Sequence, residues 1–280
     1  MNKLIQRSVA AAAFLAFAAG SAQAATWQLV DNGSSFDFFD LSADFNGTSY
    51  TKNLGLADQS SAGHFLQTGT SATTQGLPTG GATLQFHGQQ EVDTQGGSST
   101  AKLLIDGVNL LGFQPTSSGT LGGYTATQDI GVTGLQLKIQ GDANEADGSA
   151  VQVAFSGTAL ADFVSSIAAE QEVGLSLLAT IGGNVVATQD WFWSSNQDTA
   201  VNFSFGAAVG DVVELTLSLH SGATQGADHA YTAPQAFSTG IGARLSGDLT
   251  VTSAVPEPAS WMLLLAGAGV MVAARARRWR

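Results

Sequence analysis

Cysteine is absent from the 280 residues of the chain. Without thiols the chain can form no disulfide bond, no thiolate metal site and no cysteine nucleophile. A stable fold must therefore depend on an apolar core and on backbone hydrogen bonds.

Basic residues are also scarce, with ten Lys and Arg against 22 Asp and Glu. Six of the ten basic residues lie in residues 1–24 and 255–280, which hold a single acidic residue, Glu257. Residues 25–254 therefore have four basic and 21 acidic residues, a net charge of −17. Such a surface repels phosphate backbones, which excludes nucleic acid as a partner, and attracts multivalent cations. Solubility outside the cell is the simpler explanation of this acidity.

Long apolar runs occur only at the two ends of the chain. Residues 1–24 have a basic start, an apolar stretch from Val9 to Ala19, and the small residues Ala22 and Ala24 at the sites that signal peptidase recognises. This order predicts a cleaved signal peptide, so that the mature chain begins at Ala25. The alternative is an uncleaved membrane anchor.

The second apolar run extends from Ala259 to Ala274. As a helix it would be roughly 24 Å long, enough to cross a thin bilayer with help from its flanking residues. A basic tail follows it, and its members are Arg275, Arg277, Arg278 and Arg280. Arginines prefer the cytoplasmic side, so we expect the preceding chain to lie outside the inner membrane. This agrees with the topology that a signal peptide imposes.

A stiff tetrapeptide, made of Val255, Pro256, Glu257 and Pro258, stands directly before this run. The prolines hold the backbone extended, in a form that a membrane protease could engage. Together with the apolar run and the arginine tail, the tetrapeptide resembles the PEP-CTERM sorting signal over residues 255–280. The resemblance implies processing by exosortase, a membrane transpeptidase of Gram-negative bacteria that make extracellular polysaccharide. The alternative is an ordinary tail anchor.

Between the two signals, short alternating apolar segments predict antiparallel strands. They are Trp27–Val30, Phe36–Leu41, Thr83–His87, Lys102–Ile105, Gly134–Gln140, Val151–Phe155, Val201–Phe205, Val212–Leu219 and Arg244–Val251, with a hairpin over Val173–Trp193. About ten strands with short connections predict an all-β fold. We expect residues 25–254 to form one antiparallel β-sandwich, for which a jelly roll is one candidate arrangement of the strands.

Three segments are expected to differ from this pattern. Apolar residues near helical spacing predict a helix over Thr158–Ala169. Residues 42–80 and 114–129 contain few apolar side chains and many Gly, Ser, Thr and Gln, which predicts long surface loops. The hairpin is expected to turn at Gly182-Gly183-Asn184, because these residues tolerate positive φ.

One loop carries several oxygen ligands of the kind that calcium prefers. Asp142, Asn144, Glu145 and Asp147 lie within seven residues that end at Gly148. The segment resembles the start of a calcium loop, but one extra residue separates Asn144 from Asp147 and no bidentate Glu follows at the usual distance. A calcium site and a polar hairpin turn both remain possible explanations.

Two tryptophans flank a phenylalanine near the end of the predicted hairpin. Alternation along a strand predicts that Trp191 and Trp193 project to one face and Phe192 to the other. Two exposed indoles would form a stacking platform for sugar rings, whereas two buried ones belong to the core. Both explanations remain open at this point.

No hydrolase, zinc-protease or phosphate-loop motif is found, and we predict no catalytic residue. The expected function is that of a non-enzymatic surface or matrix protein associated with extracellular polysaccharide or biofilm. It would be exported across the inner membrane, anchored transiently and then released or displayed. The alternative is a carbohydrate-binding or carbohydrate-active sandwich.

Overall fold

The computed structural model describes residues 25–31, 34–45, 48–53, 57–77, 80–121, 124–141, 145–166, 169–225, 229–231 and 236–253. The predicted signal peptide and the predicted C-terminal helix lie outside these residues. Across the described ranges, no helix has the length and apolar character that crossing a membrane would require.

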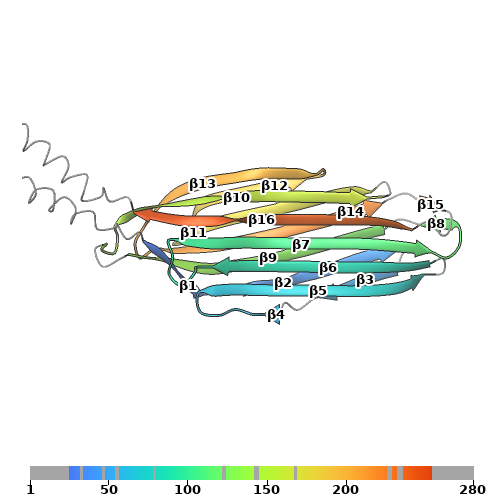
Figure 1. Cartoon of the computed structure of the whole chain (residues 1–280), viewed down its shortest axis with the longest axis horizontal. Helices are drawn as coiled ribbons and strands as arrows, with labels where there is room; N and C mark the ends of the chain where they lie inside the picture. Colours follow the sequence, from blue (N-terminus) through green and yellow to red (C-terminus); the bar gives the residue numbers. More distant parts are fainter. Residues whose placement is uncertain are drawn as a thin grey trace, which may run out of the picture.

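The described residues form two antiparallel sheets of seven strands that lie face to face (Figure 1). Sheet 1 has the order β12-β11-β14-β9-β2-β3, and β1 also pairs with β9. Its strands are β1 (Thr26–Asp31), β2 (Ser34–Phe45), β3 (Thr48–Asn53), β9 (Tyr124–Gln140), β11 (Glu170–Ile181), β12 (Asn184–Trp193) and β14 (Val212–Gln225).

Sheet 2 has the order β13-β10-β16-β7-β6-β5-β4. Its strands are β4 (Ala57–Asp58), β5 (His64–Leu77), β6 (Gly80–Asp93), β7 (Thr100–Pro115), β10 (Ala150–Ser165), β13 (Gln197–Ala208) and β16 (Phe237–Ser253). A short pair made of β8 (Gly119–Leu121) and β15 (His229–Tyr231) lies at one end of the sandwich (Figure 1). The prediction of an all-β sandwich is confirmed.

The core lies between the sheets and follows the alternation of the sequence. Leu135, Leu137 and Ile139 of β9 are fully buried, while the intervening side chains are not. The largest fully buried side chains come from both sheets: Trp27, Phe65, Phe113, Phe155, Leu84, Ile105 and Ile130. Burial of one face of each strand supplies the main favourable free energy of such a fold.

The predicted hairpin is present and turns where expected. Strand β11 ends at Ile181, Gly182 and Gly183 have φ of 57° and 78°, and β12 begins at Asn184. Glycine adopts this left-handed conformation without a Cβ penalty, which explains the position of the turn.

The predicted helix over Thr158–Ala169 is wrong, because β10 continues as a strand to Ser165. Strand β10 pairs with β13 on one side and with β16 on the other, and Ala159 and Ala161 are buried at alternate positions. Two ladders of backbone hydrogen bonds outweigh the helix propensity of the alanines in this segment, because tertiary pairing overrides intrinsic propensity.

The two predicted loops are also wrong over much of their length. Strand β5 occupies His64–Leu77 and pairs with β6 along its whole length, and β9 begins at Tyr124. In β5 the inward positions include Gln67 and Gly69, so no apolar alternation is visible in the sequence. The ladder uses backbone groups, which a polar sequence supplies equally well.

Polar side chains connect the two sheets inside the sandwich. The Gln128 amide on β9 donates to the His87 carbonyl on β6 at 3.0 Å. The Gln171 amide on β11 donates to Thr239 Oγ1 at 2.9 Å and to the Gly240 carbonyl on β16 at 3.1 Å. Hydrogen bonds of this kind offset the cost of burying polar groups and fix how the sheets are aligned.

The first and last described residues lie at the same end of the sandwich, which we call the terminal end. The Trp27 amide donates to the Ser98 carbonyl and the Val251 amide to the Ser99 carbonyl, each at 2.8 Å. The opposite, distal end carries β8 and β15 (Figure 1). Strand β16 has 17 residues and therefore separates the two ends by roughly 50 Å.

Candidate functional site

Strands β11, β12, β14 and β9 lie side by side in sheet 1 at the distal end. Val173 and Leu175 of β11 point into the core. Alternation therefore directs Glu170, Glu172 and Gly174 outward. The chain at the start of β11 thus places two carboxylates on one exposed face.

Strand register assembles a row of side chains across this face. Gly174 pairs with Phe192 on β12 and with His220 on β14, and His220 pairs with Asp129 on β9. In the next row, Glu172 pairs with Gly222. Phe192 is 67% exposed although it is a large apolar residue. The two rows together place an exposed aromatic ring near a histidine and two carboxylates, those of Asp129 and Glu172.

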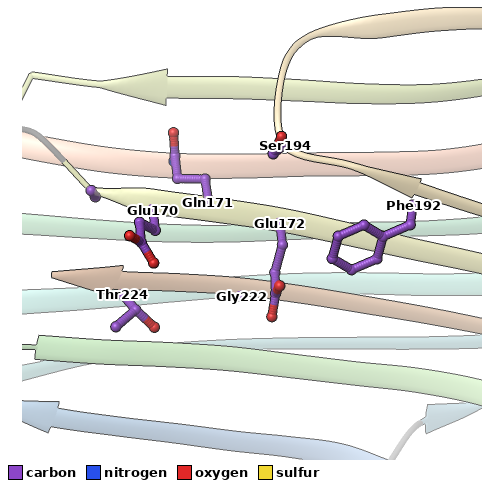
Figure 2. Close-up of a pocket in the computed structure, with 8 residues that line it drawn as sticks. Glu170, Gln171, Glu172, Phe192, Ser194, Gly222 and Thr224 are labelled. Atoms are coloured by element: carbon purple, nitrogen blue, oxygen red, sulfur yellow. The ribbon is translucent and has the colours of Figure 1, made fainter. Parts of the chain in front are cut away.

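A hollow of about 510 Å³ lies over these strands, and we call it the distal hollow. Figure 2 shows the Glu170 and Glu172 side chains on the same side of β11, with the Phe192 ring beside Glu172. Its lining includes Glu170, Glu172, Phe192, Ser194, Gly222 and Thr224, together with Ala169 and Gln171. It combines hydroxyl groups, carboxylates and one aromatic wall.

His220 links two carboxylates at the edge of the hollow. Its Nδ1 lies 2.6 Å from Asp129 Oδ1, and its Nε2 lies 3.6 Å from Glu172 Oε1. The hydrogen bond to Asp129 raises the pKa of His220 above its usual value of 6.5, burial opposes this, and Glu172 adds to the rise. The protonated imidazole, with two N–H donors, is the form that both carboxylates favour.

This arrangement predicts a pH-dependent contribution of His220 to stability. Because its folded pKa is raised, the contribution is complete below pH 6.5 and is lost as the pH rises through the folded pKa. We expect the free energy of unfolding to fall more between about pH 6 and about pH 9 in the wild type than in His220→Gln. Urea denaturation at both pH values measures this difference. An equal fall in both proteins would contradict the assigned contacts.

The two tryptophans of the sequence prediction face the core side of β12. Trp191 pairs with Leu175 and Trp193 pairs with Val173, and these two partners are buried. The two indoles themselves are partly buried and pack against the core. Their rings stack with centroids 6.5 Å apart. The predicted alternation is confirmed, and Phe192 is the exposed aromatic residue of the three. A role of the indoles in ligand stacking stays a prediction.

The predicted calcium loop is described only in part, because Asp142 and Asn144 lie outside the described residues. Asp147 is exposed, and Oε2 of Glu145 is buried with no hydrogen-bond partner among the described residues. In the described part of the chain, no three His, Asp or Glu side chains are grouped as metal ligands. The calcium site stays a prediction.

Calcium binding at this loop is expected to raise the melting temperature. A ligand that binds only the native state stabilises it by about 2.7 kcal/mol at about 100 times its Kd, which corresponds to a rise of several degrees. Thermal melts with calcium and with chelator measure this, and Asp147→Asn should abolish the difference whereas Asp190→Asn should not. Identical melts of the wild type would leave only the turn explanation.

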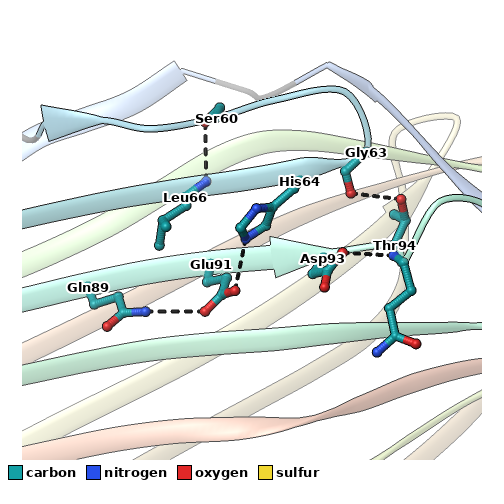
Figure 3. A network of polar contacts seen from close by, with 9 residues as sticks. Ser60, Gly63, His64, Leu66, Gln89, Glu91, Asp93 and Thr94 are labelled. Atoms are coloured by element: carbon teal, nitrogen blue, oxygen red, sulfur yellow. Dashed lines mark hydrogen bonds and ion pairs between the residues drawn. The ribbon is translucent and has the colours of Figure 1, made fainter.

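A second polar network lies on sheet 2, near the terminal end. His64 Nε2 lies 2.9 Å from Glu91 Oε1, and the Gln89 amide donates to Glu91 Oε2 at 3.2 Å. Figure 3 shows this network beside the contact of Thr94 Oγ1 with the Gly63 carbonyl, 2.8 Å long. These bonds hold the β5–β6 pair and its neighbouring turn, and we assign them a structural role.

Both predicted processing segments adjoin the terminal end. Ala22 and Ala24 precede β1, and the tetrapeptide from Val255 to Pro258 follows β16. The tetrapeptide and the basic tail lie outside the described residues. Comparison with protein families matches residues 254–278 to the PEP-CTERM protein-sorting motif. The chain carries a PEP-CTERM sorting signal.

The PEP-CTERM signal implies export, transient anchoring through the C-terminus and processing by exosortase, a membrane protease. It covers only the tail that follows the sandwich. No curated protein shows significant sequence similarity to the chain.

Similarities to solved structures are weak. The VP2 subviral particle of infectious bursal disease virus aligns over 83% of this chain and 82% of its own, with 11% identity and a TM-score of 0.17. The GH31 alpha-xylosidase of Xanthomonas citri aligns over 84% of this chain and 38% of its own, with 6% identity and a TM-score of 0.11. At these TM-scores neither likeness bears on function.

Sequence reasoning did not find the distal hollow. In the sequence, Phe192 stands out only as the neighbour of two tryptophans, and no motif includes Glu172 or Asp129. The alternation in β11 could have placed Glu170 and Glu172 on one face. No local signal could have brought His220 to Asp129, because 91 residues separate them.

Proposed function

We propose that residues 25–253 form a non-enzymatic β-sandwich that is displayed outside the cell and associates with extracellular polysaccharide in a biofilm. The observation that carries this proposal is the PEP-CTERM signal directly after the last strand of the sandwich. The net charge of −17 in residues 25–254 suits a soluble protein outside the cell. In a Gram-negative host, the partners would be signal peptidase, exosortase and the polysaccharide.

The position of the chain ends supports display of the distal end. The first and last described residues lie at the terminal end, so the distal end is roughly 50 Å from the point at which the C-terminal anchor joins the sandwich. The distal hollow lies there, at the start of β11 and the end of β14. A ligand outside the cell could therefore reach it before or after processing.

The second candidate, a carbohydrate-active enzyme, is supported only by the paired carboxylates of the hollow. A glycosidase needs two carboxyl groups on opposite sides of the scissile bond. Glu170 and Glu172 project from the same face of one strand. This geometry favours binding over hydrolysis.

The test is to express the chain in a bacterium that has exosortase and makes extracellular polysaccharide. We expect the protein in the extracellular polysaccharide fraction, with Ala25 as its first residue and no release of reducing sugar. N-terminal sequencing, fractionation and a reducing-sugar assay measure these outcomes. A protein found only in the cytoplasm, or one that releases reducing sugar, would refute the proposal.

A further inference from the structure

The distal hollow has an aromatic wall that faces water. Single exposed aromatic residues are common on protein surfaces and need no ligand. Phe192, however, lies beside a hollow of about 510 Å³, which is within the size range of small-molecule pockets. A Cβ placed at Gly174 would lie 4.0 Å from the Phe192 ring, so the ring extends over the glycine of the neighbouring strand. The ring thus lies beside the β11 backbone at the edge of the hollow.

The carboxylates of the hollow are not neutralised by lysine or arginine. Among the ion pairs of the described residues, His220 is the one cation near Glu172, and none involves Glu170. With His220 protonated, Glu170, Glu172 and Asp129 still leave the site with a net negative charge. Successive outward positions on a strand are roughly 7 Å apart, so the two glutamates present separate acceptors.

A glycine keeps the floor of the hollow open. A Cβ at Gly222 would lie 3.3 Å from Glu172 Oε1 and 3.5 Å from His220 Nε2. Any larger side chain at this position would therefore occupy the space in front of both groups. Because Gly222 has no side chain, the Glu172 carboxylate is accessible from the hollow.

We propose that the distal hollow binds a saccharide that carries protonated amino groups, an inference that rests on the proposed association with polysaccharide. The apolar face of a sugar ring would pack on Phe192, and an ammonium group near that ring gains a cation–π contact. Ammonium groups would donate charge-assisted hydrogen bonds to Glu170 and Glu172. The same charges would repel uronic acids and sulfated sugars.

The test measures binding of a glucosamine hexamer to the exported protein by calorimetry. The N-acetylated hexamer and a galacturonic acid hexamer are the matched probes. We expect the glucosamine hexamer to bind, the N-acetylated one to bind at least about tenfold more weakly, and the uronate not to bind. Phe192→Ala and Glu172→Gln should each weaken binding about tenfold, which is about 1.4 kcal/mol. Gly222→Val should weaken it by blocking the floor.

Two control variants distinguish binding at the distal hollow from nonspecific attraction between a polycation and an acidic protein. Val185→Ala changes another exposed side chain of β12, and Glu214→Gln removes a carboxylate from the outer face of β14 near the terminal end. Both should leave binding unchanged. If oligolysine binds equally well, or if Phe192→Ala binds like the wild type, the proposal is wrong.

The same experiments distinguish the proposed ligand of the distal hollow from the proposed association of the protein with polysaccharide. Wild-type protein that stays with the host polysaccharide but does not bind the glucosamine hexamer would overturn only the ligand class. Wild-type protein that is absent from the extracellular polysaccharide would overturn the proposed function.

Discussion

Replacement of Trp27 by alanine is expected to destabilise the sandwich by about 3–5 kcal/mol, the range for truncating a buried aromatic residue. Trp27 is fully buried on β1, and its Nε1 donates to the Leu249 carbonyl on β16 at 2.9 Å. The indole therefore joins sheet 1 to sheet 2 at the terminal end. The substitution leaves a cavity and also removes the donor from a buried carbonyl, which adds to the cost. Urea denaturation of the exported protein measures the change.

Trp27→Phe is the matched control, because it keeps most of the ring and removes the hydrogen bond. We expect it to cost about 1–3 kcal/mol, less than the alanine variant. Trp193→Ala provides a second comparison, since that indole is only partly buried at the edge strand. If Trp27→Ala costs no more than Trp193→Ala, β1 does not connect the two sheets as described.

Joint replacement of Pro256, Glu257 and Pro258 by alanine is expected to abolish C-terminal processing. A membrane protease can engage an extended peptide more readily than a helix, and the two prolines prevent helix formation at this site. Alanine is the best helix former and proline the worst, so the variant segment should join the apolar run as a helix. The uncut protein should then remain in the membrane fraction, which mass spectrometry and fractionation would show.

The control for this experiment is the wild-type chain in a host without exosortase, which should behave like the triple variant. In the exosortase-bearing host, the wild type should lose the segment that ends at Arg280. If it retains Arg280 there, and both proteins fractionate alike, the segment acts only as a tail anchor.

Local sequence patterns were sufficient for the features that depend on neighbouring residues. The proline pair, apolar run and arginine tail predicted the sorting signal that the family comparison matches. The alternation in Gly134–Gln140 predicted which side chains are buried in β9. Two glycines predicted the turn between β11 and β12. Each of these features is encoded within a few residues.

Contacts between distant parts of the chain decided the rest. Strand β5 has few apolar residues and exists because β6 supplies backbone partners along its length. The segment after Thr158 is a strand because β13 and β16 flank it. The same holds for the distal hollow, where Glu172, Phe192 and His220 come from three strands and meet only through register. The sequence by itself determined the C-terminal sorting signal and the apolar face of strands such as β9. Only the tertiary structure decided the lengths of the strands and the position of the distal hollow. The physical reason is that the partners in a backbone ladder are distant in the sequence, so local side-chain patterns do not show which strands pair or how far the pairing extends.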